Sequence, residues 1–423
     1  MIESQRPGHY REAHLLLGIA LLALLVRLVF SFVLFPHLAG PLGLGSDPDQ
    51  YGQLAQNWVD GKGYIFYDGA EPSTYRGPGY PLLLAAVYVV CGDLLPGAVL
   101  VQALIGALVC LPIYYIGKQA FGCWVGRTAA LMGALHPLLI WYTPRLRCEP
   151  LLALLLALAI SWSLRARNSG SLKDAFITGL FFGCAALVHQ VAILLPLVLF
   201  TAFLLLEAVR SDLAKQFAVV TVAMVGVIAP WTVRNYLVSG LVIPVHSGGI
   251  TQFVAGSYEF EHYHEAPLQS VELAHLSSVY AARLLGFNDV SEYDGRATGV
   301  DQALLPYALS YLRSGPEKLL IKTIVQLPRF WYLSESPLKS RVLAAIQGAF
   351  LLPALVGGFH TLRGSRRGLP LLVTIVYFNV LYAALVVEGR YSTPVVPYVV
   401  VLAAAGLRMI FDIIRKRRSR RRA

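Results

Sequence analysis

The stretch Leu15–Phe35, LLLGIALLALLVRLVFSFVLF, decides the fold, because Arg27 is its only charged residue. About 20 apolar residues in an α-helix cross the roughly 30 Å hydrocarbon core of a bilayer. The stretch is too long for the apolar core of a cleaved signal peptide, and no small-residue cleavage site follows it. We therefore expect a retained membrane-spanning helix in which Arg27 pairs with a neighbouring helix.

The composition extends this expectation to the whole chain. Of all residues, 56% are hydrophobic and 14% are charged, whereas soluble domains are about 45–50% apolar and about 25% charged. The net charge is +11, and the basic residues cluster in short connections and in the tail Arg415–Arg422. This is the positive-inside pattern of membrane proteins, with added attraction to anionic lipid headgroups. The sequence thus predicts a multi-pass membrane protein that does not bind nucleic acid.

Apolar windows bounded by basic connections predict an all-α polytopic protein with about ten transmembrane helices. The spans are expected near residues 15–36, 97–117, 124–143, 149–165, 174–189, 191–208, 217–237, 340–361, 369–387 and 393–413. Every basic cluster then lies on one side of the membrane, and both termini lie there too. We expect the cytoplasmic (inner or plasma) membrane, with the opposite side facing outside the cytoplasm.

Two long loops are expected outside the cytoplasm, the first over 37–80 and the fourth over 238–339. The run 81–91 is too short to span and is predicted to be a juxtamembrane or partly inserted helix. In the fourth loop, Glu317–Tyr332 has apolar residues at helical spacing, which predicts a helix on the membrane surface. The predicted parts are 1–237 with its catalytic loop, 238–339, the C-terminal helices 340–413 and the basic tail 414–423.

Ionisable and polar residues gather where the predicted helices end on the outer side. They are Asp47, Asp49, Arg145, Arg147, Glu149, His189, Gln190, Arg234, Asn235, Glu388 and Arg390. A charge near the membrane centre costs about 2.5–3.5 kcal/mol on insertion scales, so such groups usually face a cavity and often mark function. Acids and arginines on one face suit an anionic, lipid-linked substrate.

A sugar on polyprenyl phosphate already carries a good leaving group, so its transfer needs no general acid. It needs a carboxylate that takes the proton of an acceptor hydroxyl and arginines that bind the phosphate. Asp47 is the candidate base, and Arg234 and Arg390 are candidates for the phosphate. The alternative interpretation is that Asp47 and Asp49 only form a turn that caps the next helix.

Six sequence motifs follow one another along the chain. They are SDPDQYGQLAQNWVDGKGY, TYRGPGYPLLLA, HPLLIWYTPRLRCEPLL, PWTVRNYLVSGLVIPVHSGG, RFWY and EGRYSTPVVPYVVVLAAAGL. With them, most of residues 15–410 resembles the glycosyltransferase C superfamily, in its protein O-mannosyltransferase-like (family 39) branch that includes the lipid A aminoarabinose transferases. The resemblance implies an inverting transferase that uses a polyprenyl-phosphate sugar on the outer membrane face.

The resemblance also assigns residues. It places the catalytic aspartate at Asp47, four positions before Tyr51, with Asp49 as the alternative because Pro48 stands where the family often has an acid. Glu149 matches a family glutamate that would orient the acceptor or, with Asp49, hold a divalent metal; no cofactor is otherwise expected. The substrate-binding candidates are Arg76, Glu149, His189, Arg234, Asn235, Glu388, Arg390 and Tyr391.

The predicted function is therefore a membrane glycosyltransferase that moves a hexosyl or pentosyl group from a polyprenyl-phosphate donor. Its acceptor would be a protein, lipid or glycan outside the cytoplasm. The rival is a transporter or flippase of lipid-linked sugars, which would tend to have symmetric halves and binding groups deep in the membrane. Here the ionisable groups gather at one surface and no half-to-half symmetry is apparent, which favours the enzyme.

Overall fold

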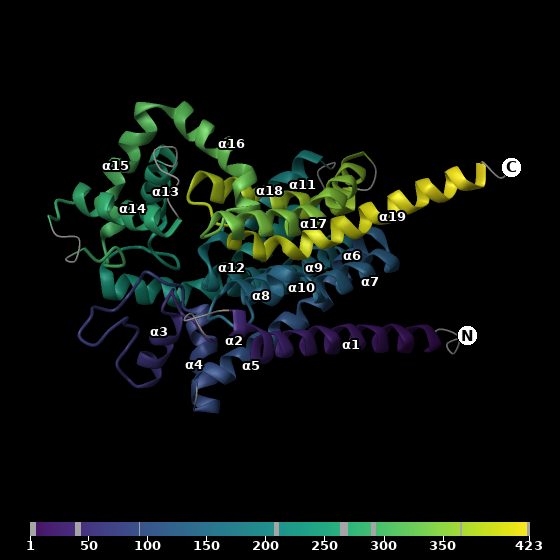
Figure 1. Ribbon diagram of the computed structural model, residues 1–423, viewed down its shortest axis with the longest axis horizontal. Coiled ribbons are helices and arrows are strands. Elements are labelled where there is room, and N and C mark those ends of the chain that lie inside the picture. Colours follow the sequence, from purple (N-terminus) through teal and green to yellow (C-terminus); the bar gives the residue numbers. More distant parts are fainter. Residues whose placement is uncertain are drawn as a thin grey trace.

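The helices of this protein form a long bundle (Figure 1). The structure, a computed structural model, describes residues 6–38, 44–92, 94–206, 211–262, 270–288, 293–363 and 366–420. All regular elements in these ranges are helices, which confirms the all-α prediction. Both termini lie at one end of the bundle, the terminal end, and the long loops fold at the opposite, loop end (Figure 1).

Seven described segments are long and apolar enough to cross a membrane. They are Arg11–Leu38, Leu95–Phe121, Glu149–Ser169, Asp212–Ser239, Pro337–Arg363, Arg366–Ala384 and Gly389–Ser419. Their helices are α1 (Arg6–Val29) with η1 (Phe30–Leu34) and α2 (Phe35–Leu38), α5 (Leu94–Leu108) with α6 (Cys110–Phe121), α9 (Glu149–Ser169), α12 (Ser211–Ser239), α17 (Pro337–Arg363), η4 (Arg366–Gly368) with α18 (Leu369–Ala384), and η5 (Gly389–Val395) with α19 (Val396–Arg420). Seven of the ten predicted spans are thereby confirmed.

The other three predicted spans are shorter helices. The span predicted as 124–143 is instead two helices, α7 (Cys123–Ala134) and α8 (Pro137–Trp141). The break has a local cause, because Pro137 has no backbone N–H and forces the residue before it into an extended conformation. The spans 174–189 and 191–208 correspond to α10 (Leu172–Val188) and to η2 (Gln190–Ala192) with α11 (Leu195–Leu206).

Arg27 ties α1 to the neighbouring helices, as predicted. Its side chain is fully buried, and Nη1 donates to Ala23 O at 3.0 Å and to Ala134 O at 2.9 Å. Gly106 of α5 lets the guanidinium pass, because a Cβ atom there would overlap Arg27 Nε. The charge that interrupts the first apolar stretch is thus used to join three helices.

Two short helices build the first loop and its exit. They are α3 (Tyr51–Val59) and α4 (Gly79–Cys91), and α4 packs against α3, α5 and α10. With 13 residues, α4 is a short helix like the one predicted over 81–91. In the first turn of α4, the buried side chain of Tyr80 packs against the ring of Tyr51, the first residue of α3. This contact attaches α3 to the loop end of the bundle.

The fourth loop folds into four more helices at the loop end (Figure 1). They are α13 (Gly249–His262), α14 (Ser270–Leu284), α15 (Val300–Ser314) and α16 (Pro316–Tyr332). Lys322 on the inner face of α16 donates to Ser257 Oγ and to Leu385 O, whereas Leu320 and Ile324 are exposed. The predicted helix over 317–332 is confirmed, with its apolar side turned outward and its lysine turned inward.

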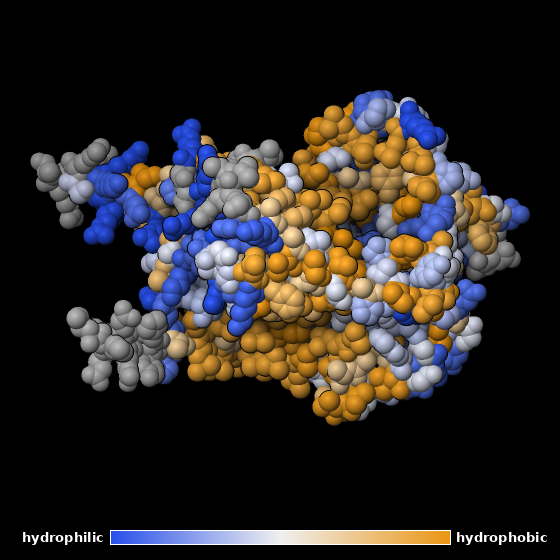
Figure 2. Space-filling view, turned by 180° about the vertical axis from the view of Figure 1, so that it is seen from behind, coloured by the Kyte–Doolittle hydropathy of each residue, from blue (hydrophilic) through white to orange (hydrophobic). Residues whose placement is uncertain are grey.

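The surface matches a membrane protein. Seen from behind, the side of the bundle is mainly apolar, and hydrophilic residues concentrate near the terminal end and over parts of the loop end (Figure 2). With the seven long apolar segments, this makes the chain a multi-pass membrane protein. The predicted domain boundaries at 237, 339 and 413 remain predictions.

Candidate functional site

The first loop makes a tight turn immediately before α3. Both carboxylate oxygens of Asp47 accept backbone hydrogen bonds from the start of this helix, Oδ1 from Tyr51 N at 2.9 Å and Oδ2 from Gly52 N at 2.7 Å. Gln50 has a left-handed φ of 58°, which is uncommon for a residue with a side chain. Asp47 thus caps α3. Burial raises the pKa of its carboxyl, although the two backbone N–H groups act in the opposite direction.

Asp49 lies among three arginines. Its Oδ1 accepts from Arg76 Nη2 at 2.9 Å, and its Oδ2 contacts Arg147 Nη1 and also Arg390 Nη1 at 3.2 Å. Arg76 comes from the first loop, Arg147 from the segment before α9, and Arg390 from η5 near the C-terminal end of the chain. Each of the four side chains is about one-fifth exposed or less. We call these four residues the arginine cluster.

Two further acids border the arginine cluster. Glu388 Oε2 lies 2.7 Å from Arg390 Nε, and Glu149 Oε1 lies 3.9 Å from the same atom. Tyr391 accepts from Arg390 Nη2 at 3.2 Å through its hydroxyl. Three guanidinium groups therefore lie beside three acidic side chains.

Several buried polar atoms of this site have no hydrogen-bond partner among the described residues. They include Arg76 Nε, Arg147 Nε and Glu149 Oε2. Buried polar groups are nearly always hydrogen-bonded in proteins. The oxygens and hydroxyls of a polar ligand can provide hydrogen-bond partners for such donors and for such a carboxylate oxygen.

A rigid polar and aromatic support holds the arginine cluster in place. The Tyr51 hydroxyl donates to Cys148 Sγ, and the guanidinium of Arg76 lies over the Tyr51 ring at 5.2 Å. Gln102 of α5 accepts from the Tyr80 hydroxyl and donates to Thr143 O. These contacts fix the segment before α9, and with it the position of Arg147.

Apart from Asp47, described above, and His189, described below, the residues predicted for the site fall into two groups. Asp49, Arg76, Glu149, Glu388, Arg390 and Tyr391 lie together in and around the arginine cluster. Arg234 instead donates to Ser73 O at 2.7 Å and lies over the Trp231 ring, while Asn235 donates to Ile243 O and Val245 O. The contacts of Arg234 and Asn235 thus support the loops rather than the arginine cluster.

His189 lies at the border of the site. Its Nδ1 accepts from Val191 N at 3.3 Å, and its ring centroid lies 5.4 Å from that of His246 and 6.3 Å from that of Tyr382. Tyr382 in turn stacks on Tyr391 at 4.3 Å. The bond to Nδ1 leaves Nε2 of His189 as the protonated nitrogen, which can donate a hydrogen bond.

Arg147 was not among the residues chosen for the site from the sequence. Its signal is its position two residues before Glu149 at the start of a helix, but Arg145 stands only two positions further away. Arg145 lies over the Trp141 ring at 4.5 Å, and only Arg147 reaches Asp49. The sequence does not separate these two arginines.

A metal at Asp49 and Glu149 remains a prediction. Within the described ranges, no group of three or more His, Cys, Asp or Glu side chains is placed to hold a metal ion. Of the acidic stretch Glu259–Glu265, which could chelate a metal in an extended conformation, residues 263–265 lie outside the described residues, and Glu259 and His262 belong to helix α13.

Comparison with known proteins supports the fold. The family model described as dolichyl-phosphate-mannose-protein mannosyltransferase matches residues 75–233, less than half of the chain. No curated protein matches the sequence. The oligosaccharyltransferase AglB from Archaeoglobus fulgidus, solved with an inhibitory peptide and a dolichol-phosphate, has a TM-score of 0.61 and 17% identity over 97% of this chain and 52% of that one.

The apo form of the Archaeoglobus fulgidus oligosaccharyltransferase gives a TM-score of 0.60 and 17% identity, over 96% of this chain and 51% of that one. ArnT from Cupriavidus metallidurans bound to undecaprenyl phosphate gives a TM-score of 0.46 and 18% identity, over 92% and 77%. The chain spans about half the length of the oligosaccharyltransferases it matches. The chain thus shares the fold of the Archaeoglobus fulgidus oligosaccharyltransferase, in agreement with the glycosyltransferase C-like fold expected from the sequence motifs.

Proposed function

We propose that this protein transfers a sugar from a polyprenyl-phosphate donor to a hydroxyl group of an acceptor outside the cytoplasm. The observation that carries the proposal is the convergence of Arg76, Arg147 and Arg390 on one point at the loop end of the bundle. Guanidinium groups bind phosphate oxygens through two parallel hydrogen bonds and keep their charge at every physiological pH. Three of them together are suited to a phosphate whose negative charge grows as the sugar leaves.

Asp47 is the proposed base. Both oxygens of Asp49 already accept from arginines, so we assign Asp49 the role of positioning these arginines. The Asp47 carboxylate accepts from backbone N–H groups at the start of α3, and burial raises the pKa of its carboxyl. A base with a raised pKa takes a proton more readily.

The proposed reaction is a single displacement. The acceptor oxygen attacks the anomeric carbon, its proton moves to Asp47, and the bond from that carbon to the phosphate oxygen breaks. Polyprenyl phosphate leaves with the bonding electron pair, and the configuration at the anomeric carbon inverts. Glu149 and Glu388 remain beside Arg390 and are placed to contact the hydroxyls of the sugar or the acceptor.

The proposed orientation follows from charge. The terminal end carries the basic tail and the basic turns around Lys118, Arg165 and Arg363, so the positive-inside rule places this end in the cytoplasm. The arginine cluster then lies on the outer side of the cytoplasmic membrane. A transporter is disfavoured because these ionisable groups lie at helix ends on one side rather than at mid-depth.

The test uses the full chain in lipid nanodiscs with a panel of polyprenyl-phosphate sugars and a mixture of hydroxyl acceptors, with and without a divalent metal. Release of free polyprenyl phosphate by the wild type, reduced about 10²–10⁴-fold in Asp47→Asn, is the expected result. Donor that binds and crosses the bilayer without being cleaved would instead establish a transporter.

A further inference from the structure

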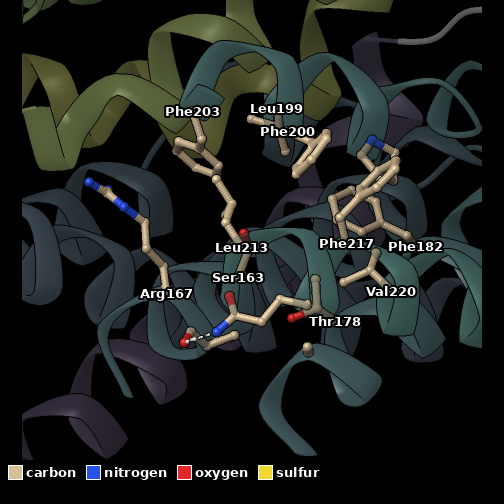
Figure 3. Close-up of a pocket in the computed structure, with 14 residues that line it drawn as sticks. Ser163, Arg167, Thr178, Phe182, Leu199, Phe200, Phe203, Leu213, Phe217 and Val220 are labelled. Atoms are coloured by element: carbon tan, nitrogen blue, oxygen red, sulfur yellow. Dashed lines mark hydrogen bonds between the residues drawn. The ribbon is translucent and has the colours of Figure 1, made fainter. Parts of the chain in front are cut away.

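A cavity at the terminal end is too small to bind a sugar or a lipid chain. It lies between α9, α10, α11 and α12, and Figure 3 shows Arg167 at one end of it and Phe182 and Val220 at the other. Its free volume is about 50 Å³, and Phe200 and Phe217 stack in its wall with ring centroids 4.2 Å apart. This is room for water molecules only. A contact with a consequence for function lies instead at the loop end, where α3 and α15 are found (Figure 1).

Gln50 has a backbone conformation that a residue with its side chain rarely adopts. In the part of the chain that the structure describes, it is the only residue other than glycine with a positive φ, at 58°. The left-handed region brings Cβ close to the following carbonyl oxygen, and glycine, asparagine and aspartate enter it more readily than glutamine. The contacts around Gln50 must therefore hold it in this conformation.

The conformation of Gln50 decides where both aspartates of the first loop lie. Gln50 N donates to Asp47 O at 3.1 Å, and Gln50 O accepts from Leu54 N at 3.2 Å. On one side of Gln50, Asp49 reaches the arginine cluster, and on the other, Tyr51 N donates to the Asp47 carboxylate. A return of Gln50 to a negative φ would change the direction of the chain between the proposed base and the helix that it caps.

The side chain of Gln50 is held by the fourth loop. Arg296 Nη1 donates to Gln50 Oε1, although 246 positions separate the two residues. The Arg296 side chain is itself oriented by Asp294, whose Oδ1 accepts from Arg296 Nε at 2.9 Å. Its guanidinium also lies over the ring of Phe66 at 4.7 Å, and Phe66 is buried together with Leu54 of α3. Arg296 therefore contacts the first loop at two points.

The contact between Arg296 and Gln50 would persist through the proposed reaction, whereas the other contacts of the turn would weaken. Asp47 would gain a proton, and a protonated carboxyl group has less capacity to accept hydrogen bonds. The arginines that contact Asp49 would turn toward the phosphate of the donor. Neither Gln50 nor Arg296 takes part in these two steps, so their contact can hold the turn while both aspartates change partners.

We propose that Arg296 is a positioning residue for sugar transfer, because it holds Gln50 in the left-handed conformation and thereby keeps Asp47 and Asp49 in place. The inference rests on the proposed function. The Arg296 guanidinium is bonded to Gln50 and Asp294 rather than to the arginine cluster. Its removal should therefore slow turnover without weakening the binding of the donor.

The kinetic experiment compares two variants of the full chain in lipid nanodiscs, supplied with a polyprenyl-phosphate sugar and a hydroxyl acceptor. Arg296→Met should lower kcat about tenfold, the size of effect expected from strain at one backbone position, and leave the donor KM within about twofold. The control Arg313→Met removes an exposed arginine in the last turn of α15 and should change neither constant.

A rescue separates positioning from a general loss of structure. Glycine adopts left-handed conformations freely, so in a Gln50→Gly background Arg296→Met should lower kcat by less than about twofold. A loss of kcat that Gln50→Gly does not reduce would overturn the positioning role. So would a rise in the donor KM without a fall in kcat, or equal effects of Arg296→Met and Arg313→Met.

Hydrogen exchange tests the hold on the turn without any substrate. The amides of Tyr51 and Gly52, which donate to Asp47, should exchange about tenfold faster in Arg296→Met, and Gln50→Gly should reduce this difference. Unchanged exchange would show that Arg296 does not hold the turn. If the wild type consumes no donor, the proposed function fails together with the role in transfer, whereas normal transfer by Arg296→Met overturns only that role.

Discussion

Arg390 Nη1 donates to Asp49 Oδ2 at 3.2 Å, although 341 positions of the chain separate the two residues. Asp49 follows the first membrane helix, and Arg390 precedes the last one. Arg76 of the same first loop and Arg147 of the segment before α9 reach the same carboxylate. One partly buried carboxylate therefore joins three parts of the chain, and its removal should affect both stability and substrate binding.

The first prediction is a strong coupling between Asp49 and Arg390. Either Asp49→Asn or Arg390→Gln should destabilise the fold by about 3 kcal/mol, because each leaves buried charge without its partner. The double variant should lose less than the sum of the two. Chemical unfolding in detergent measures this cycle, and the exposed pair Lys62–Asp68 in the same loop is a matched control that should show negligible coupling. Additive effects at Asp49 and Arg390 would contradict the prediction.

The second prediction concerns the acid side of the pH–rate profile. Asp47 must be deprotonated to accept a proton, and burial raises its pKa. Transfer should therefore fall as the pH is lowered through this raised pKa, at a higher pH than an exposed aspartate would cause. The residual activity of Asp47→Asn should lose this dependence, whereas Asp68→Asn, at an exposed loop position, should keep it. An unchanged acid limb in Asp47→Asn would exclude Asp47 as the base.

The third prediction is a rise in stability with pH that depends on Lys322. Burial lowers the pKa of this lysine to about 7, with partial compensation from Glu259 and Glu261. The unfolded chain keeps the proton up to about pH 10.4, so between these values the unfolded state binds more protons and stability rises with pH. Burial raises the pKa of Glu259 to about 7, so its opposite contribution is complete above about pH 8.

Thermal unfolding in nanodiscs between pH 8 and 9.5 tests this effect. The increase expected from one group is at most about 1.4 kcal/mol per pH unit. Lys322→Met should flatten the curve, and Lys318→Met, half-exposed on the same helix, should not. A pH dependence of stability that is the same in the wild type and in Lys322→Met would refute the assignment.

The fourth prediction concerns the contact of α17 with α19. A Cβ atom on Gly357 would overlap the carbonyl oxygen of Leu402, whereas one on Gly348 in the same helix would meet nothing within 4 Å. Gly357→Ala should therefore separate the helices and cost about 1–3 kcal/mol. Gly348→Ala should be neutral or stabilise the helix by up to about 1 kcal/mol. Similar unfolding curves for the two variants would show that the helices are not in close contact.

Much of the architecture could be predicted because a bilayer imposes one simple rule. Apolar length alone located seven spans, and basic turns placed both termini at the same end. The rule failed between residues 124 and 143, where the local effect of Pro137 ended one helix and began another. Pro137 is visible in the sequence, but proline also occurs inside continuous helices here, as Pro353 does in α17.

The candidate site was predicted less completely, because its membership depends on which way side chains point at helix ends. Trp231 stands three positions before Arg234 on the same helix, and the Arg234 guanidinium lies over its ring. The guanidinium also lies over the ring of Tyr64 in the first loop, so Arg234 points toward this loop. Arg145 and Arg147 are equivalent by composition, yet one lies on Trp141 and the other on Asp49. Tertiary packing decides in which direction each of these arginine side chains points, and a single sequence does not reveal that packing.

The joining of residues 49, 76, 147 and 390 has a consequence for biosynthesis. During translation the first three emerge early, but Arg390 enters the membrane only with the final hairpin, α18 and η5–α19. A nascent or truncated chain would hold Asp49 between two arginines and lack the third, together with Glu388 and Tyr391. On the proposed function, a chain in which α18 and η5–α19 have not yet inserted lacks one of the three arginines proposed to bind phosphate and should be inactive in sugar transfer.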